Sequence, residues 1–208
     1  APHAVGLTAV KPQWTGPAGP LDQDRRWEDA RRLLHDGACP PGLRAAGLLV
    51  LLYGQTLSDI TALTTRHVLR EDDRVLLLLG SRPVELPAPL DALVTGLADS
   101  PETTGRGLLA APGDWLFPGR WPGTSLTADA LAKRLRGIGI SPRRARSTAL
   151  LALAAEVPAA ILAKTLGISI HAAVGWQKAS AGDWAGYAAD VSRRQQLVSS
   201  RHETPRQP

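Results

Sequence analysis

Residues 141–156 read SPRRARSTALLALAAE, a stretch that indicates a helix with a basic beginning and an apolar body. Ser141 followed by Pro142 is typical of a helix start, because serine caps the first turn and proline fits within it. Four side chains at helical spacing share one face of this helix: Arg143, Arg146, Leu150 and Leu153. We therefore expect Arg146 at the edge of an apolar stripe, partly shielded from water.

A guanidinium at that edge has two uses. It can donate paired hydrogen bonds to a phosphate, because its planar fork of N–H groups matches the phosphate oxygens. It can instead form a buried salt bridge with an acidic residue from elsewhere in the chain. Three candidates for such a partner stay open in the sequence: Glu28, Asp59 and Glu85.

The stretch that leads into this helix is strongly basic. Between Arg120 and Arg146 there are seven basic residues and one acidic residue, a net charge of +6 in 27 residues, whereas the whole chain of 208 residues carries +5. Basic side chains at this density neutralise phosphates and release counterions when they bind nucleic acid. The alternative is a solvated face, since arginine outnumbers lysine 20 to 4 and methionine and asparagine are absent, a composition typical of GC-rich coding.

A second pattern follows this helix. Residues 163–169 read AKTLGIS, and with the apolar residues Ala173, Val174 and Trp176 they indicate a helix, a glycine turn and a second helix that packs back. This is the pattern of a helix-turn-helix, which places its second helix in the major groove. The groove-facing positions would be Ser169, His171, Ala172, Gly175 and Lys178. An ordinary helical hairpin is the alternative.

The rest of the chain is rich in helices and contains one β-hairpin. We predict helices over residues 25–35 (capped by Asp24), 43–53, 57–63, 90–98, 127–136 (capped by Thr127), 158–166, 170–178 and 183–193. Strands at 74–79 and 84–86 form the hairpin, and residues 99–113 form a mobile loop. We expect an extended lead-in over residues 1–23, one domain over 24–193 and a flexible tail over 194–208.

Several classes of protein are excluded. The longest nearly uncharged apolar stretch, residues 45–54, is about half the length of a membrane-spanning helix, and no secretory signal opens the chain. Cys39 is the single cysteine, which excludes an internal disulfide and a cysteine-based zinc cluster. We expect no metal and no cofactor, and a cytoplasmic protein.

Taken together, these segments resemble the catalytic domain of tyrosine recombinases, the phage-integrase family. The resemblance covers residues 25–192 and rests on five segments in the family's order: YGQTLSDI at 53–60, the hairpin at 74–89, LFP at 116–118, PRRARST at 142–148 and LGI at 166–168. It implies an α+β, mostly α fold with a small antiparallel β-sheet. It also implies a site that cleaves DNA with a tyrosine, assisted by two arginines, a lysine and two histidine-type groups.

Most of that catalytic set is missing from this chain, and Arg146 alone is retained. Thr56 stands at the first arginine's position and Gly80-Ser81-Arg82 at the hairpin lysine's position. Four other positions of the family pattern are also changed: Arg143, Ser147, Ile168, and Trp176 or Gln177 at the nucleophile. Phosphoryl transfer needs a nucleophile, a proton donor and charge stabilisation, and isoleucine and tryptophan supply none of these.

We therefore predict a catalytically inactive, nucleoid-associated protein that binds duplex DNA. The predicted contacts are Arg82, Arg120, Lys133, Arg134, Arg136, Arg143, Arg144, Arg146, Ser169, His171 and Lys178. One alternative is an active strand-transferase with a non-standard nucleophile, for which Tyr187 is the nearby tyrosine, interpreted here as packing. The others are a helix-turn-helix regulator and an interaction scaffold that forms homo-oligomers or docks on another DNA-bound protein through Trp184, Tyr187 and Val191.

Overall fold

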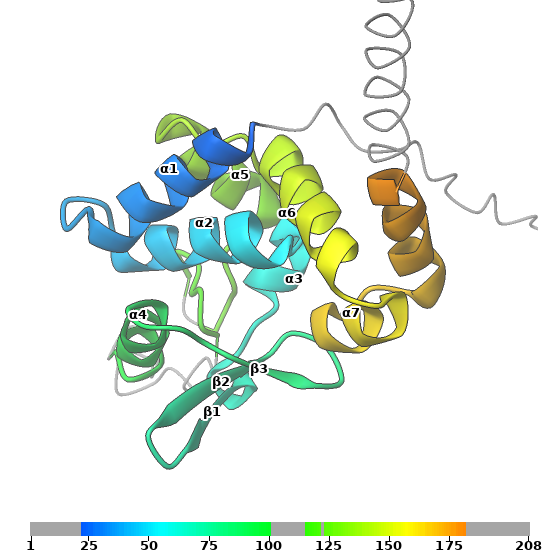
Figure 1. Cartoon of the computed structure of the whole chain (residues 1–208). Coiled ribbons are helices and arrows are strands. Elements are labelled where there is room, and N and C mark those ends of the chain that lie inside the picture. Colours follow the sequence, from blue (N-terminus) through cyan, green and yellow to red (C-terminus); the bar gives the residue numbers. More distant parts are fainter. Residues whose placement is uncertain (1–21, 101–114, 122, 182–208) are drawn as a thin grey trace, which may run out of the picture.

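The computed structural model describes residues 22–100, 115–121 and 123–181 of the chain (Figure 1). The helices are α1 (Gln23–His35), α2 (Pro41–Tyr53), α3 (Leu57–Thr61), the 3-10 helix η1 (Thr65–His67), α4 (Leu90–Ala98), α5 (Ala128–Gly137), α6 (Pro142–Glu156), α7 (Ala159–Leu166) and the helical residues 170–181. The strands are β1 (Val68–Glu71), β2 (Arg74–Leu78) and β3 (Pro83–Glu85). The predicted α+β, mostly α class is confirmed.

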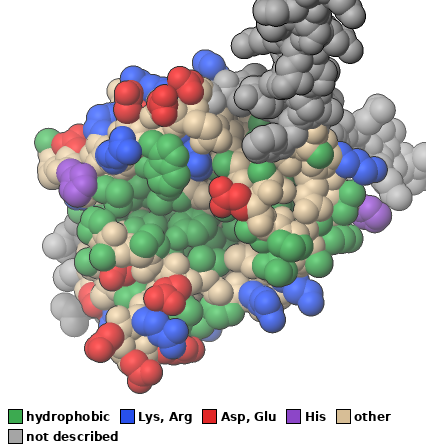
Figure 2. Space-filling model, viewed as in Figure 1, with side chains coloured by type: hydrophobic (Ala, Val, Ile, Leu, Met, Phe, Trp, Pro, Cys, Tyr) green, Lys and Arg blue, Asp and Glu red, His purple; other side chains and the backbone are tan. Residues whose placement is uncertain are grey.

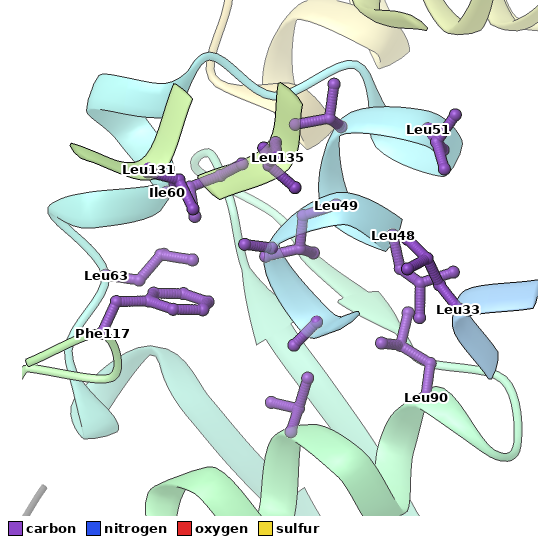
Figure 3. Packing of buried hydrophobic residues seen from close by; sticks show 14 of the residues in the cluster. Leu33, Leu48, Leu49, Leu51, Ile60, Leu63, Leu90, Phe117, Leu131 and Leu135 are labelled. Carbon is purple, nitrogen blue, oxygen red and sulfur yellow. The ribbon is translucent and has the colours of Figure 1, made fainter. Parts of the chain in front are cut away.

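Helix α2 forms the centre of the fold. Its residues 45, 46 and 48–51 have no exposed surface, and α2 packs against α1, α4, α5 and α6. Figure 3 shows Leu48, Leu49 and Leu51 of α2 among leucines from α1, α4 and α5. A helix that is apolar nearly all round is stable in water only when other elements cover every side of it, so the composition of α2 requires this central position.

A second apolar cluster joins α6, α7 and the helical residues 170–181. Its buried members include Leu150, Leu162, Leu166 and Trp176. Tyr53, the last residue of α2, is half-buried and packs against both clusters. Burial raises the pKa of Tyr53 to about 12, because the ionised phenol would lose its hydration there.

The sheet has three antiparallel strands in the order β1-β2-β3, one more than the sequence predicted. Leu76 pairs with Leu69 of β1 and with Glu85 of β3. The sequence VLRE of β1 has no clear alternation of buried and exposed residues, which is why periodicity missed it. The turn between β1 and β2 contains Asp72 in the left-handed conformation (φ 51°), which aspartate tolerates better than most residues.

Local signals placed most helices within two residues of their observed bounds. Thr127 caps α5 as predicted, accepting a hydrogen bond from the Ala130 amide at 3.2 Å. The predicted cap of α1 was wrong: Asp22, and not Asp24, accepts the capping bond. The predicted helix at 183–193 and most of the loop at 99–113 lie outside the described residues.

Buried or half-buried arginines bind helix ends. Arg26 donates to the Leu51 carbonyl in the last turn of α2 at 3.0 Å, and Arg44 donates to the Leu33 carbonyl in the last turn of α1 at 2.6 Å. The last carbonyls of a helix have no partner within it, so these cations stabilise the helix ends. Part of the arginine excess therefore has a structural role.

The turn between β2 and β3 is attached to the end of α7. The Lys164 carbonyl accepts hydrogen bonds from the Ser81 and Arg82 amides, at 2.8 and 3.1 Å. Gly80 and Gly167 make this contact possible, because a Cβ on Gly80 would lie 2.3 Å from the Lys164 carbonyl oxygen. Among the described residues, none of the helices combines the length and the apolar composition that a membrane span needs.

Gly54 ends α2 in the left-handed conformation (φ +60°), and a Cβ there would lie 2.7 Å from Leu150 Cγ on α6. Gly54→Ala should therefore lower the free energy of unfolding by about 2–4 kcal/mol, through backbone strain and overpacking. Urea denaturation followed by circular dichroism measures this change.

Gly96→Ala is the matched control, because Gly96 lies within α4 and an added Cβ would meet no atom within 4 Å. Alanine is the better helix former by about 1 kcal/mol, so this variant should be as stable as the wild type or more stable. Equal stability of the two variants would contradict the packing of α2 on α6.

Candidate nucleic-acid interface

A pocket of about 340 Å³ opens where the end of α2 and the start of α3 meet α5 and the start of α6. Its lining residues are Gln55, Thr56, Leu57, Ala132, Arg136, Ser141, Pro142, Arg143 and Arg146. Three arginines from two helices thus converge on one hollow. The long basic stretch of the sequence, which is spread over 27 residues, contributes these three to a single concave site.

The start of α6 adds partial positive charge to this pocket. Helix α6 begins at Pro142 with Ser141 at the N-cap position, as predicted. Ser141 therefore occupies the predicted cap position, but its side chain makes no capping hydrogen bond. The first-turn amides of a helix have no acceptor within the helix, and they favour a nearby anion.

Arg146 lies one turn into α6 and is half-buried. Its Nε atom is buried and has no hydrogen-bond partner. Burial lowers the pKa of Arg146, and the negative charge of Asp59 partly raises that pKa again. The guanidinium nevertheless stays charged at neutral pH. The fold therefore places at the pocket a cation whose Nε–H donates to no group of the described residues.

The salt bridge that was the alternative for Arg146 is absent from the described part of the chain. Glu28 pairs with Arg25 and Glu85 pairs with Arg74, each at 3.7 Å. Asp59 instead accepts a hydrogen bond from the Thr56 hydroxyl at 2.6 Å. All three candidate acids therefore have other partners in the structure.

Gln55 is a pocket residue that the sequence did not reveal. It is 4% exposed, and its Nε2 donates to the Leu166 carbonyl at the end of α7 at 3.2 Å. This bond ties the pocket wall to the helix that precedes the glycine turn at Gly167. The sequence around Gln55 shows only that it follows a glycine that ends a helix. Nothing in that sequence indicates a hydrogen-bond partner 111 residues away.

The other predicted contacts lie on several elements, and the pocket does not gather them. Exposed side chains outside the pocket are found at Arg82, Arg120, Lys133, Arg134, Arg144, Ser169, His171 and Lys178. Arg134 lines a different, mostly apolar hollow of about 930 Å³ between the start of α2, α4 and α5. On the face drawn in Figure 2, basic side chains are dispersed among acidic ones around a broad hydrophobic area.

The predicted helix, glycine turn and helix are present at residues 159–181. Gly167 ends α7 with φ +73°, and the Ser169 hydroxyl accepts from the Ala172 amide at 3.1 Å. Ala173 and Trp176 are buried as expected, whereas Val174 is 37% exposed. This geometry suits both a helix-turn-helix and an ordinary hairpin, so the groove-facing role of its second helix stays a prediction.

Two of the positions that correspond to the family's catalytic groups are buried. Ser147 is 5% exposed and Trp176 is 4% exposed, while Ile168 packs against the second apolar cluster. The predicted docking residues Trp184, Tyr187 and Val191 lie outside the described residues. Among the described residues, no group of three or more histidine, cysteine or acidic side chains could hold a metal ion.

Comparison with solved structures finds recombinases that share this fold. The XerA recombinase superposes with a TM-score of 0.56 at 15% identity, covering 88% of this chain and 68% of XerA. The XerH site-specific recombinase, in a pre-cleavage complex with its difH substrate, gives 0.56 at 16% identity and covers 78% and 51%. The Tn1549 transposon integrase, in complex with a circular intermediate DNA, gives 0.54 at 16% and covers 82% and 65%.

These likenesses confirm the fold that the sequence resemblance implied, and at such low identity they show the fold alone. The chain spans about half to two thirds of the length of these proteins. No protein-family model matches the sequence. A search of curated proteins finds no match either.

A cation kept without a bonding partner should cost stability. Replacing Arg146 with methionine keeps most of the aliphatic packing and removes a buried donor, so Arg146→Met should raise the free energy of unfolding by about 0.5–1 kcal/mol. Urea denaturation of the variant and the wild type measures the change.

Arg26→Met is the matched control. Arg26 is 5% exposed and its donors bind the Leu51 carbonyl and the Gln23 side chain. Loss of these charge-assisted bonds should lower the free energy of unfolding by about 2 kcal/mol. If both variants lose stability alike, Arg146 has a structural role and the pocket is not held open for a ligand.

Proposed function

We propose that this chain binds duplex DNA through the basic surface around Arg146 and does not cleave it. The single observation that carries the proposal is the charged Arg146 side chain at a pocket it shares with Arg136 and Arg143, with its Nε buried and without a partner. The remaining predicted contacts lie outside that pocket, on several elements, and would extend the DNA-binding surface: Arg82, Arg120, Lys133, Arg134, Arg144, Ser169, His171 and Lys178.

The chemistry of the pocket favours a phosphate. A guanidinium donates two parallel hydrogen bonds to phosphate oxygens, and such charge-assisted bonds are about twice as strong as neutral ones. The start of α6 adds its own unpaired amides, which favour anions. The fold is shared with the XerH recombinase bound to difH and with the Tn1549 integrase bound to DNA, which makes a DNA phosphodiester the anion of choice.

The side chains at the pocket support binding without cleavage. A nucleophile for phosphoryl transfer needs a base to activate it and an acid for the leaving oxygen. The residues that line the pocket include no histidine, tyrosine, lysine or carboxylate. The hydroxyl of Thr56 already donates to Asp59, and Tyr53 packs between two apolar clusters with its pKa raised to about 12.

Arg146→Ala should weaken binding to a mixed-sequence duplex of about 20 base pairs by roughly tenfold at low salt, because one charge-assisted phosphate contact is lost. The slope of log affinity against log salt should fall by about one unit. Fluorescence anisotropy across a salt series measures both quantities. Arg146→Lys should recover the slope but only part of the affinity, since an ammonium lacks the fork.

Arg74→Ala is the matched control, because it removes one exposed arginine from β2, away from the pocket lining. It should leave the affinity within about twofold of the wild type. Absence of any duplex binding by the wild type at low salt would overturn the proposed function. If Arg74→Ala and Arg146→Ala lost the same amount of DNA affinity, Arg146 would have no special part in binding.

Cleavage is tested separately with suicide duplexes that trap a covalent protein–DNA intermediate. The wild type should form no adduct that survives denaturing electrophoresis, because the pocket offers no activated nucleophile. The chain has two tyrosines, Tyr53 and Tyr187. Adducts that form with the wild type and vanish in Tyr187→Phe would establish the strand-transferase alternative instead.

A further inference from the structure

Beside the pocket, Thr56 and Asp59 form a closed pair of hydrogen bonds. The Thr56 hydroxyl oxygen accepts from the Asp59 amide at 3.1 Å, and the hydroxyl donates to Asp59 Oδ2 at 2.6 Å. The first bond caps α3. Because the oxygen accepts from the amide, its hydrogen points to the carboxylate, and one Asp59 oxygen is held at the start of its own helix.

Asp59 and Arg146 influence each other without pairing. The charge of Asp59 acts on the guanidinium, whose pKa it raises against the effect of burial. Within the described residues the two side chains form no ion pair, and Arg146 Nε has no hydrogen-bond partner. An exposed carboxylate near an incompletely bonded cation would ordinarily turn toward it, since charge-assisted pairs are the stronger hydrogen bonds.

The Thr56 hydroxyl is the group in the structure that opposes this turn. Thr56 itself lines the pocket, so the pair lies at the pocket's edge on the side of α3. Asp59 is exposed, which leaves its carboxylate free to rotate if the hydroxyl is removed. Two effects of opposite sign on the anion affinity of the pocket follow. The Thr56 hydroxyl raises the affinity because it keeps the Asp59 carboxylate from pairing with Arg146, and the negative charge of Asp59 lowers the affinity because it repels an anion.

We infer that Thr56 is a positioning residue that holds Asp59 away from Arg146, and that Asp59 sets an upper limit on the affinity of the pocket for a DNA phosphate. The inference rests on the proposed function, because it takes the ligand of Arg146 to be a phosphodiester. It assigns to Thr56 and Asp59 the control of binding strength through their effect on Arg146.

The test is a set of binding measurements on the full chain with a fluorescein-labelled mixed-sequence duplex of about 20 base pairs at one low salt concentration. Asp59→Asn should bind about fivefold more tightly, because it removes one negative charge beside a pocket that would bind an anion. Thr56→Ala should bind about fivefold more weakly, because the freed carboxylate then pairs with Arg146.

Two further variants separate positioning from a loss of structure. Thr56→Ala combined with Asp59→Asn should bind as tightly as Asp59→Asn alone, because no carboxylate remains to be freed. Thr56→Ser keeps the hydroxyl and should restore the wild-type affinity. If Thr56→Ala acted only by damaging α3, the double variant would be as weak as Thr56→Ala, and this result would overturn the inference.

Asp129→Asn removes the same charge from α5, where the side chain is exposed and is not among the groups that shift the pKa of Arg146. It should change the affinity by less than twofold. Equal gains in Asp129→Asn and Asp59→Asn would overturn the inference, because they would reflect net charge alone. Wild-type binding that is unchanged in Thr56→Ala and Asp59→Asn would overturn it too, whereas no binding by the wild type would overturn the proposed function and this inference with it.

Discussion

The direct contact between the end of α2 and the middle of α6 is the constraint on which the site depends. Gly54 reverses the chain in a left-handed conformation, and its Cα faces Leu150 so closely that no side chain fits between them. The next two residues, Gln55 and Thr56, thereby line the same pocket as Arg146. A single backbone property of glycine thus joins the core helix to the basic helix.

The arginines of this chain fall into two groups, which differ in whether the protein itself accepts their hydrogen bonds. Arg26 and Arg44 donate to carbonyls at helix ends and contribute to stability. Arg136, Arg143 and Arg146 converge on a pocket, and Arg146 keeps a buried donor without a partner. A count of charges treats all of them alike, so net charge alone is weak evidence for a nucleic-acid partner. The stronger evidence is which arginines still have hydrogen-bond donors without an acceptor in the protein.

The proposed function, binding a phosphate without attacking it, agrees with the side chains that this recombinase-like fold carries. Positions that carry reactive groups in the resembling family carry here a hydroxyl bonded to Asp59, a buried serine and a buried tryptophan. The helix that carries Arg146, and the glycine turn that anchors α7 to the β2–β3 hairpin, are kept. The basic pocket is therefore consistent with the proposed binding of a phosphate, and these three side chains are consistent with the proposed lack of cleavage.

The sequence by itself determined what depends on neighbours along the chain: the helix starts at Thr127 and Ser141, the buried character of α2 and the glycine turn at Gly167, because caps, periodicity and glycine act over a few residues. It missed β1, whose pairing depends on β2. The tertiary structure decided which arginines converge, that Asp59 bonds to Thr56 and leaves Arg146 unpaired, and that Gln55 reaches Leu166. Hydrogen bonds and ion pairs between distant segments depend on how the helices pack, and the sequence around each residue does not encode that packing locally.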